Sequence, residues 1–334
     1  MTESDAIRVT VAIPSRDRPD SLCRVVRDAC GGHRRPDEIV VICQGRRALE
    51  AARRLVREVP EALPLLRFYA SSRTGVAAAR NDAIRQATGQ FIAFSDDDMR
   101  LPQAWLASML DVWRREWDAG PVLLTGPIDA PEGAADAAAT PGHRPGVRRR
   151  VWHAPPRDGD VLYGGHFGAP RNVYERAGSP PFDERLGPGT RFRGGEDEVF
   201  AFRVLRAGVP ITFDPAIRAT HMADETEWIR SQFRHSRGAG ALFVLRWSLG
   251  DRAAPGAAVR TVFGIAAKGV RVAMRRRFRE AAGRFAAIGG MVAGALLWWT
   301  TGAGRAPSAS EPRPGDLRFL PLGNQSREQA EPDA

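Results

Sequence analysis

The first 130 residues alternate between two patterns of hydrophobic positions. Short runs rich in β-branched and aromatic residues are typical of buried strands, and they read "IRVTVAIP", "DEIVVIC", "LLRFYA", "QFIAFS" and "PVLLTGPI". Between these runs, hydrophobic residues recur at helical spacing over residues 20–30, 47–58, 75–87 and 103–117. Strand and helix in this rhythm predict a parallel sheet covered by helices, with right-handed crossovers.

The pattern changes after the last of these strands. Residues 130–156 are rich in Ala, Gly, Pro and Arg without periodicity, and we expect a mobile loop there. Ordered patterning resumes at Val161, whereas the tail after Arg305 is polar and proline-rich, which predicts disorder. We therefore expect three parts: an α/β domain over residues 1–222, a basic helical region over 223–304 and a disordered tail over 305–334.

Composition and charge refine this division. A hydrophobic content of 43% over 334 residues is typical of a folded protein. The net charge is +10, but 13 basic and two acidic residues lie between residues 230 and 284, so this segment carries +11 and the remainder −1. Cys23, Cys30 and Cys43 follow no zinc or haem spacing, and we expect buried, reduced thiols. The first residues do not resemble a secretory signal, so we expect a cytoplasmic protein.

The fourth predicted strand, "QFIAFS", leads directly into Asp96, Asp97 and Asp98. Ligands of an open α/β sheet bind beyond the carboxyl ends of its strands, and this triplet lies at that edge. Adjacent carboxylates repel one another, and hard oxygen ligands suit Mg²⁺ or Mn²⁺ bound together with ligand phosphates. One alternative is that Asp98 caps the next helix, which explains one aspartate only. A haloacid-dehalogenase-type phosphatase is disfavoured because Met99 follows the triplet.

A second acidic cluster stands in "GGEDEVF", at the start of a predicted helix. The glycine pair permits a ligand to approach the backbone closely, and Glu196 and Asp197 are favoured at the positive end of a helix. They would also fit there as ordinary helix-start acids. His221 ends a strand-like run further on, and histidine is a frequent metal ligand, although a lone one is more often structural.

Together these segments resemble family 2 glycosyltransferases of the GT-A fold, a Rossmann-like α/β architecture. The resemblance spans about residues 7–221, and its separate motifs are specific as an ordered set. It is carried by "VTVAIPSRDRPDSL", "PDEIVVICQG", "RTGVAAARNDAIRQATGQFIAFSDDD" and "FDERLGPGTRFRGGEDEVFAFRVLRAG". It implies a metal-dependent, inverting transfer of a sugar from a nucleotide-diphospho-sugar to an acceptor hydroxyl.

The resemblance also implies residue roles on the donor side. The D-x-D element, with Asp96 and Asp97, contacts the donor, while Asp98, Asp96 and His221 hold Mg²⁺ or Mn²⁺. The ion bridges the two phosphates and stabilises the leaving nucleoside diphosphate. Further donor contacts are expected from the following residues: Asp17, Arg73, Arg80 and Gln44. The family usually has an acidic residue where this chain has Cys43, which makes Gln44 the candidate for an altered contact with the nucleobase of the donor. This departure leaves the expected metal ligands and catalytic base unchanged.

On the acceptor side, Asp197 resembles the general base of the family. It would take the proton from the attacking hydroxyl. Glu196 would shape the site or contact the acceptor, and His166, within "YGGHFGAPRNVYERAG", is a further acceptor candidate. The acceptor is expected to be a glycan, a lipid-linked molecule or a small molecule.

Other functions fit the sequence less well. A sugar nucleotidyltransferase shares a related fold and metal, but it would begin with a glycine-rich phosphate loop, which "IPSRDRP" is not. A catalytically inactive nucleotide-sugar-binding protein is suggested only by Cys43, and the intact acidic motifs disfavour it. The basic segment is an electrostatic footprint for phosphate, but no standard nucleic-acid motif accompanies it, so we expect no nucleic-acid partner.

The apolar run at residues 285–304 suggests a membrane partner instead. It is uncharged and about as long as a spanning helix. The basic segment "KGVRVAMRRRFREAAGR" precedes it, and such residues bind anionic headgroups. We expect peripheral attachment to the inner face of the cell membrane, interfacial more than spanning, and an acceptor among cell-envelope or lipid-linked glycans. The alternative is a helical hairpin packed on the catalytic domain.

Overall fold

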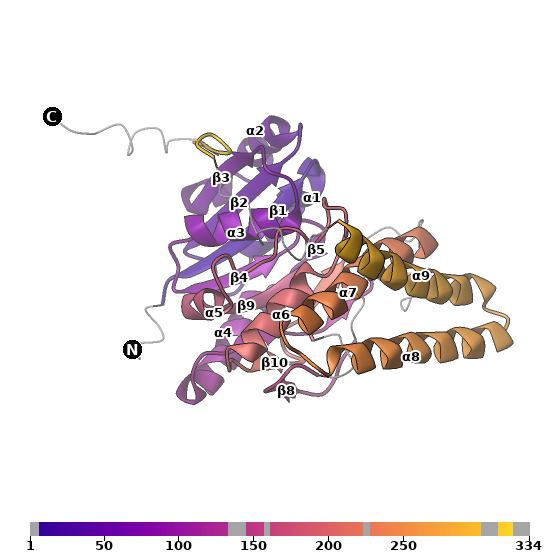
Figure 1. The fold of residues 1–334 in the computed structure, drawn as a ribbon. Coiled ribbons are helices and arrows are strands. Elements are labelled where there is room, and N and C mark those ends of the chain that lie inside the picture. The colour runs from indigo at the N-terminus through magenta and orange to yellow at the C-terminus, as the bar shows by residue number, and fades with distance from the viewer. Residues whose placement is uncertain (1–6, 133–144, 157–160, 223–227, 302–312, 323–334) are drawn as a thin grey trace.

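The computed structural model describes residues 7–132, 145–156, 161–222, 228–301 and 313–322 (Figure 1). Within them, nine strands form one sheet in the order β12-β3-β2-β1-β4-β9-β6-β10-β8. These strands are β1 (Val9–Arg16), β2 (Glu38–Gln44), β3 (Leu66–Ser71), β4 (Phe91–Ser95), β6 (Leu123–Thr125), β8 (Arg150–Trp152), β9 (His166–Pro170), β10 (Ile211–Phe213) and β12 (Leu317–Leu320).

Helices cover both faces of the parallel part of this sheet. Successive residues of a strand point to opposite faces, so Val11 and Ile13 join one apolar cluster while Ala12 joins the other. Because both faces are covered, the strands are continuous hydrophobic runs rather than alternating ones. The helices of this part are α1 (Pro19–Cys30), α2 (Ala48–Glu58), α3 (Val76–Gln86), α4 (Trp105–Glu116), α5 (Arg171–Arg176) and α6 (Glu196–Arg206), with 3₁₀ turns over Pro60–Leu65 and Trp117–Ala119.

The α/β order predicted for the first 130 residues is confirmed, but the sheet as a whole is mixed rather than parallel. Strands β1, β2, β3 and β4 pair in parallel, whereas β9 runs antiparallel between β4 and β6. Two segments expected to lack structure supply antiparallel edge strands. Strand β8 lies within the predicted mobile loop and pairs with β10, and β12 lies within the predicted disordered tail and pairs with β3.

Hydrophobic side chains explain these two edge strands. Trp152 on β8 and Phe319 on β12 both pack against the cluster on one face of the sheet, and the Phe319 ring lies 5.3 Å from that of Tyr69. Each strand is short and sits in a polar sequence, so its pattern is weak at sequence level. The rest of the two predictions, over residues 133–144, 305–312 and 323–334, lies outside the described residues.

A second sheet of three short strands lies beside the carboxyl ends of β1 and β4. It contains β5 (Met99–Arg100), β11 (Ala219–His221) and β7 (Ile128–Asp129), in that order. Its register pairs His221 with Met99, and the N–H of Met222 donates to the carbonyl of Asp98 at 2.9 Å. This pairing brings the end of the aspartate triplet next to a histidine more than a hundred residues away in the sequence.

The predicted C-terminal helical extension is present as three long helices, α7 (Trp228–Ser248), α8 (Ala254–Met274) and α9 (Phe278–Thr300). Helix α7 lies against α6, and α8 and α9 extend side by side away from the sheet (Figure 1). Small residues let α7 and α9 approach closely: a Cβ on Gly240 would lie 1.9 Å from the carbonyl oxygen of Met291, and one on Gly294 equally close to that of Arg237. The hairpin of α8 and α9 is thus anchored through α9 on α7.

Candidate active site

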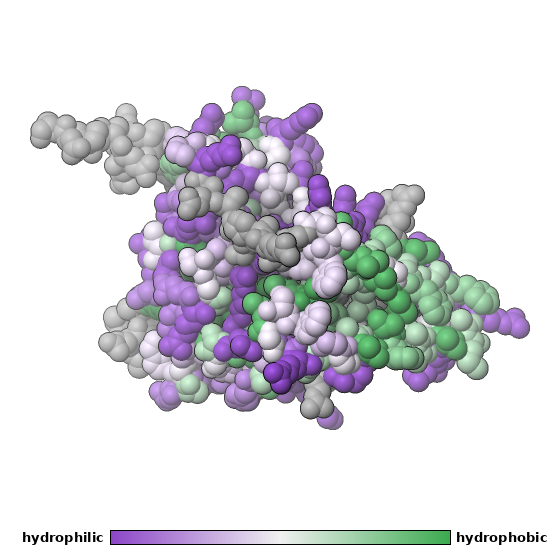
Figure 2. Space-filling model, in the orientation of Figure 1, coloured by the Kyte–Doolittle hydropathy of each residue, from purple (hydrophilic) through white to green (hydrophobic). Residues whose placement is uncertain are grey.

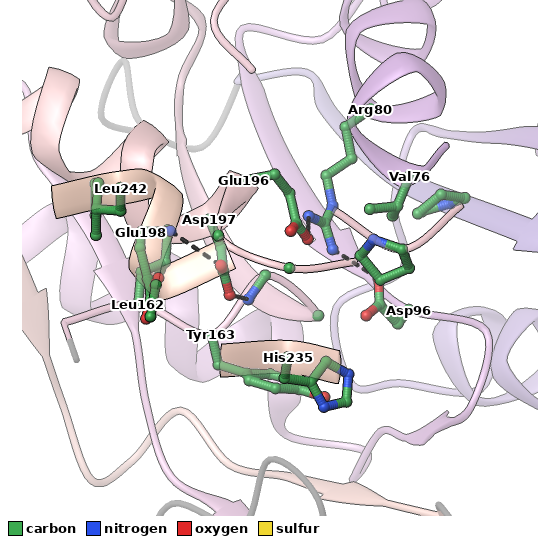
Figure 3. Close-up of a pocket in the computed structure, with 18 of the residues that line it drawn as sticks. Val76, Arg80, Asp96, Leu162, Tyr163, Glu196, Asp197, Glu198, His235 and Leu242 are labelled. Atoms are coloured by element: carbon green, nitrogen blue, oxygen red, sulfur yellow. Dashed lines mark hydrogen bonds and ion pairs between the residues drawn. The ribbon is translucent and has the colours of Figure 1, made fainter. Parts of the chain in front are cut away.

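A cavity of about 1150 Å³ opens at the carboxyl ends of β1 and β4, at the edge where the sequence places the aspartates. Its wall combines both acidic motifs with residues of the helical extension (Figure 3). The charged and polar residues at its sheet end are Ser15, Arg16, Arg18, Gln44, Arg80, Asp96, Asp97, Asp98, Glu196, Asp197 and His221.

Arg18 neutralises two of the three aspartates. Its Nη1 lies 3.0 Å from Asp97 Oδ1 and 2.5 Å from Asp98 Oδ2, and the Ser15 hydroxyl donates to Asp97 at 2.7 Å. Burial nevertheless raises the pKa of Asp97 to about 6, because the opposing charge of Arg18 compensates it only in part. The sequence interpretation missed Arg18. Its signal was available, since "SRDR" follows the strand adjacent to β4 and parallel strands end at one edge.

Arg80 neutralises the third aspartate and joins the two acidic motifs. This residue of α3 is fully buried, with Nη2 3.1 Å from Asp96 Oδ1 and Nη1 3.0 Å from Glu196 Oε1. Its guanidinium also lies 5.6 Å from the ring centroid of Phe182. Burial, together with the neighbouring charge of Asp197, raises the pKa of Glu196 to about 7 despite the pairing with Arg80. Both terminal nitrogens of Arg80 are thus engaged by carboxylates of the protein.

Asp98 and His221 form a pair suited to a divalent cation. His221 Nε2 lies 3.3 Å from Asp98 Oδ1. Two ligands about 2.0–2.2 Å from one ion and at right angles to each other are roughly 3 Å apart, so this spacing fits a hard cation. Burial opposes ionisation of Asp98, but His221 and Arg18 outweigh it and lower its pKa to about 2. The ionised carboxylate, together with the imidazole once its Nε2 has lost its proton, is a suitable donor set for Mg²⁺ or Mn²⁺.

The third expected metal ligand does not join this pair. Asp96 directs Oδ1 to Arg80. Within the described part of the chain, no group of three His, Cys, Asp or Glu side chains is arranged to hold a metal ion. A cation at Asp98 and His221 would therefore need further oxygens, which the phosphates of a ligand can supply.

Asp197 stands on the cavity wall at the first turn of α6. Its Oδ2 accepts the N–H of Gly164 at 3.0 Å, and its Oδ1 accepts the N–H of Glu198 at 2.9 Å (Figure 3). These backbone donors fix the direction of the carboxylate. The glycine pair that precedes the motif permits close packing of α7, since a Cβ on Gly195 would lie 2.9 Å from backbone atoms of Gly238. Both glycines also line the cavity.

Two of the expected donor contacts point elsewhere. Arg73 is buried, and its guanidinium lies 2.7 Å from Asp82 and 2.5 Å from Glu184. Asp17 accepts the N–H of Arg47 at 2.9 Å, at the start of α2. Neither lines the cavity. The donor contacts predicted for both residues are untested, but in this structure other parts of the protein occupy their polar groups.

Gln44 does line the cavity, with its amide paired to backbone. Nε2 donates to the carbonyl of Gly75 at 3.0 Å, and the N–H of Gly75 donates to Oε1 at 3.2 Å. Gly75 has φ +109° at the start of α3, a conformation that favours glycine. The neighbouring Cys43 thiol is buried, which raises its pKa to about 12. All three cysteines are free and buried, as expected.

His166 is a structural residue and not part of the cavity wall. It is fully buried, and Trp105 Nε1–H donates to its Nδ1 at 3.1 Å. The indole can only donate, so Nδ1 carries no proton and Nε2–H donates to the carbonyl of Ile217 at 3.0 Å. The predicted acceptor role is untested, and the burial of His166 away from the cavity wall disfavours it. The tight network instead links α4 to the segment that precedes β11.

This chain is similar to known proteins in sequence and in fold. Residues 10–157 match the family model described as "Glycosyl transferase family 2". The search of curated proteins gave no match.

The structure resembles a mannosyltransferase from Pyrobaculum calidifontis solved with GDP-Man and Mn²⁺, with a TM-score of 0.58 and 16% identity over 87% of this chain and 86% of that one. It also resembles GalNAc-T7 solved with UDP, GalNAc and Mn²⁺, with a TM-score of 0.54 and 16% identity over 83% of this chain and 54% of that one. At these identities the likeness concerns the fold, which confirms the predicted GT-A class.

The neutral state of His166 predicts acid sensitivity. Burial lowers its pKa from 6.5 to about 4. The unfolded chain therefore binds more protons than the folded one between these pH values, and stability falls as pH decreases. We expect this group to account for a loss of about 3 kcal/mol in the free energy of unfolding from pH 6.5 to 4.

Denaturant titrations of the wild type and His166→Gln across that range measure the loss. Glutamine can accept from the indole and donate to the carbonyl, so the variant should fold with a flatter pH profile. Parallel profiles for the two proteins would contradict the assignment.

Proposed function

Because residues 10–157 match the glycosyltransferase family 2 model, we propose that this protein transfers a sugar from a nucleotide-diphospho-sugar to an acceptor hydroxyl, with inversion at the anomeric carbon. The observation that carries the proposal is the joining of two acidic motifs across one cavity. Arg80 links Asp96 to Glu196 there, and Asp197 follows directly. A donor held at the aspartates therefore lies within reach of a base on α6.

The donor half of the cavity suits a nucleoside diphosphate. Ser15, Arg16 and Gln44 line it at the ends of β1 and β2, where ligands of open α/β sheets bind. We propose that Asp98 and His221 hold Mg²⁺ or Mn²⁺ together with diphosphate oxygens, and that the ion replaces Arg18 as the partner of Asp98. When bound, the ion stabilises the charge that develops on the leaving diphosphate. Buried Asp97 and half-buried Asp96 then shape the donor site beside it.

We assign the general base to Asp197. Its carboxylate lines the cavity and is held by two backbone N–H groups, so it is oriented before an acceptor arrives. The base takes the proton from the acceptor hydroxyl as that oxygen attacks the anomeric carbon. Glu196, buried and paired with Arg80, positions the start of α6 rather than contacting the reacting atoms.

The hairpin of α8 and α9 supports attachment to the inner face of the cell membrane. Figure 2 shows hydrophobic residues across this hairpin and hydrophilic ones at its tip. The exposed apolar side chains are Val259, Phe263, Val270 and Met274 on α8 and Phe278, Phe285, Val292, Leu296 and Trp299 on α9. Arg275, Arg276 and Arg277 lie at the turn between the helices, where they can meet anionic headgroups.

Among the described helices, α9 is also long and apolar enough to cross a membrane by length and composition, with a hydropathy of 1.4. Its contacts with α7 favour the interfacial mode, because α7 is packed on the GT-A domain. An enzyme held in this way would act on acceptors presented at the membrane surface, such as cell-envelope or lipid-linked glycans.

The metal proposal predicts that nucleotide binding depends on Asp98. Calorimetric titration of GDP and UDP should show affinity at least about tenfold higher with Mn²⁺ than without it. Asp98→Ala should lose this gain, because one anionic ligand is removed. Asp111→Ala, an exposed aspartate on α4, is the matched control and should behave as wild type. Equal affinities for both nucleotides across all proteins and conditions would exclude the metal site.

The base assignment predicts a separation of binding from turnover. Asp197→Asn should bind nucleoside diphosphate with the affinity of the wild type. Its rate of forming nucleoside diphosphate from nucleotide-sugars should fall at least about a hundredfold, the usual scale for loss of a general base. The assay uses GDP-mannose and several UDP-sugars with a membrane lipid extract as acceptor. Glu198→Gln, its neighbour on α6, is the control. If Glu196→Gln abolished release while Asp197→Asn retained it, the base would be Glu196.

Membrane attachment predicts binding to anionic vesicles. The full chain should co-sediment with phosphatidylglycerol vesicles and less with phosphatidylcholine vesicles, since each basic residue near an anionic surface contributes about 1 kcal/mol. Phe263→Ser combined with Trp299→Ser should weaken binding, because these side chains are 71% and 72% exposed. Leu49→Ser, at an exposed position on α2, serves as control. Wild-type protein that stays in the supernatant with both vesicle types would refute attachment.

A further inference from the structure

The cavity continues beyond Asp197 into a second half with apolar side chains in its wall. In Figure 3, Leu162 and Leu242 lie on the opposite side of Asp197 from Asp96. The apolar side chains of this half come from α6 to α9 as well as from the segment before β9. Its principal members are Leu162, Phe202, Leu242, Phe243, Ile265 and Met291.

Its size suits two molecules rather than one. At about 1150 Å³ the cavity exceeds the roughly 300–1000 Å³ typical of a pocket for one small ligand. The sheet end accounts for a nucleotide-sugar through its aspartates and arginines. The apolar half is then left for the second substrate, with Asp197 at the boundary between the two.

The helices of this half also present polar residues to the cavity, namely Gln232, His235, Ser236, Arg246 and Thr261, so its wall is mixed rather than purely apolar. Hydroxyl groups lose their water on entering a site and need hydrogen-bonding partners there. Arg246, a polar residue of this wall, is already paired with Asp251 at 2.8 Å and lies 5.0 Å from the ring centroid of Phe202. A hydrocarbon chain needs no such partners and gains from leaving water.

Helix α8 connects this half of the cavity with the exposed apolar surface. Thr261 and Ile265, one turn apart, face the cavity. Val259 and Phe263 precede each of them by two residues, which places them on nearly the opposite face of the helix, and both are exposed. One side of α8 therefore faces the reaction chamber and the other faces the surroundings, where an apolar stripe with Arg260 and Arg271 beside it suits a membrane interface.

We propose that the apolar half of the cavity binds the hydrocarbon chain of a lipid-linked acceptor, which enters from the membrane surface along the hairpin of α8 and α9. The hydroxyl of its head group then reaches Asp197, next to the donor. The part played by the hydroxyl rests on the proposed function. Binding of the chain does not, because it requires no catalysis.

Photolabelling of the full-length protein in anionic nanodiscs tests this proposal. The probe is farnesol carrying a diazirine, and mass spectrometry maps the labelled residues. We expect label on the cavity-facing residues of α7, α8 and α9, with labelling there at least about fivefold lower in Ile265→Asp, since a buried charge repels an apolar chain. Leu49→Asp, at an exposed position on α2 away from the hairpin, should leave cavity labelling within about twofold of wild type.

Label confined to the outer stripe, an equal effect of both variants, or no label on the cavity wall would overturn the proposal. If Ile265→Asp does not fold, Phe243→Ser replaces it, because Phe243 lines the same wall from α7. Release of nucleoside diphosphate from nucleotide-sugars by the wild type is measured in parallel. Cavity labelling without release of nucleoside diphosphate would refute the proposed function and leave this inference standing. Release of nucleoside diphosphate without cavity labelling would support the proposed function and refute this inference.

Discussion

Repulsion among carboxylates at one edge of the sheet is the constraint around which this structure is organised. Asp96, Asp97 and Asp98 follow β4 without interruption, and α6 brings Glu196 and Asp197 to the same cavity. Arg18 and Arg80 compensate this negative charge in different ways. Arg80 is fully buried and fixes the distance between the two acidic motifs, whereas the side chain of Arg18 is 55% exposed and can yield its place to a cation.

The site therefore has a fixed frame, which includes Arg80, and a positive charge on Arg18 that a cation can replace. The frame needs contacts from distant parts of the chain, because β11 carries His221 to Asp98 and α7 packs on the glycines before α6. Helix α7 in turn anchors the hairpin of α8 and α9 through α9. The cavity and the exposed apolar surface of the hairpin are therefore built on one continuous set of packed elements, which is why we propose a lipid-linked acceptor.

Most of the GT-A domain could be predicted from sequence because its strands and helices are encoded by local hydrophobic periodicity. The acidic motifs could be recognised because their spacing is unusual. The position of Arg73, Asp17 and His166 outside the cavity wall could not be predicted, since their partners Glu184, Arg47 and Ile217 are distant in sequence. Strand β12 was missed for a related reason: a single short edge strand gains its stability from β3 and Tyr69 rather than from its own pattern.

We propose that Asp98 and His221 hold the cation that binds the donor diphosphate. Crystals grown with Mn²⁺ and GDP or UDP test it most directly, through anomalous scattering at the manganese edge. We expect an anomalous peak within coordination distance of Asp98 Oδ1 and His221 Nε2, shared with diphosphate oxygens, and Arg18 withdrawn from Asp98. Ordered nucleotide at this edge of the sheet with no peak between those two atoms would contradict it.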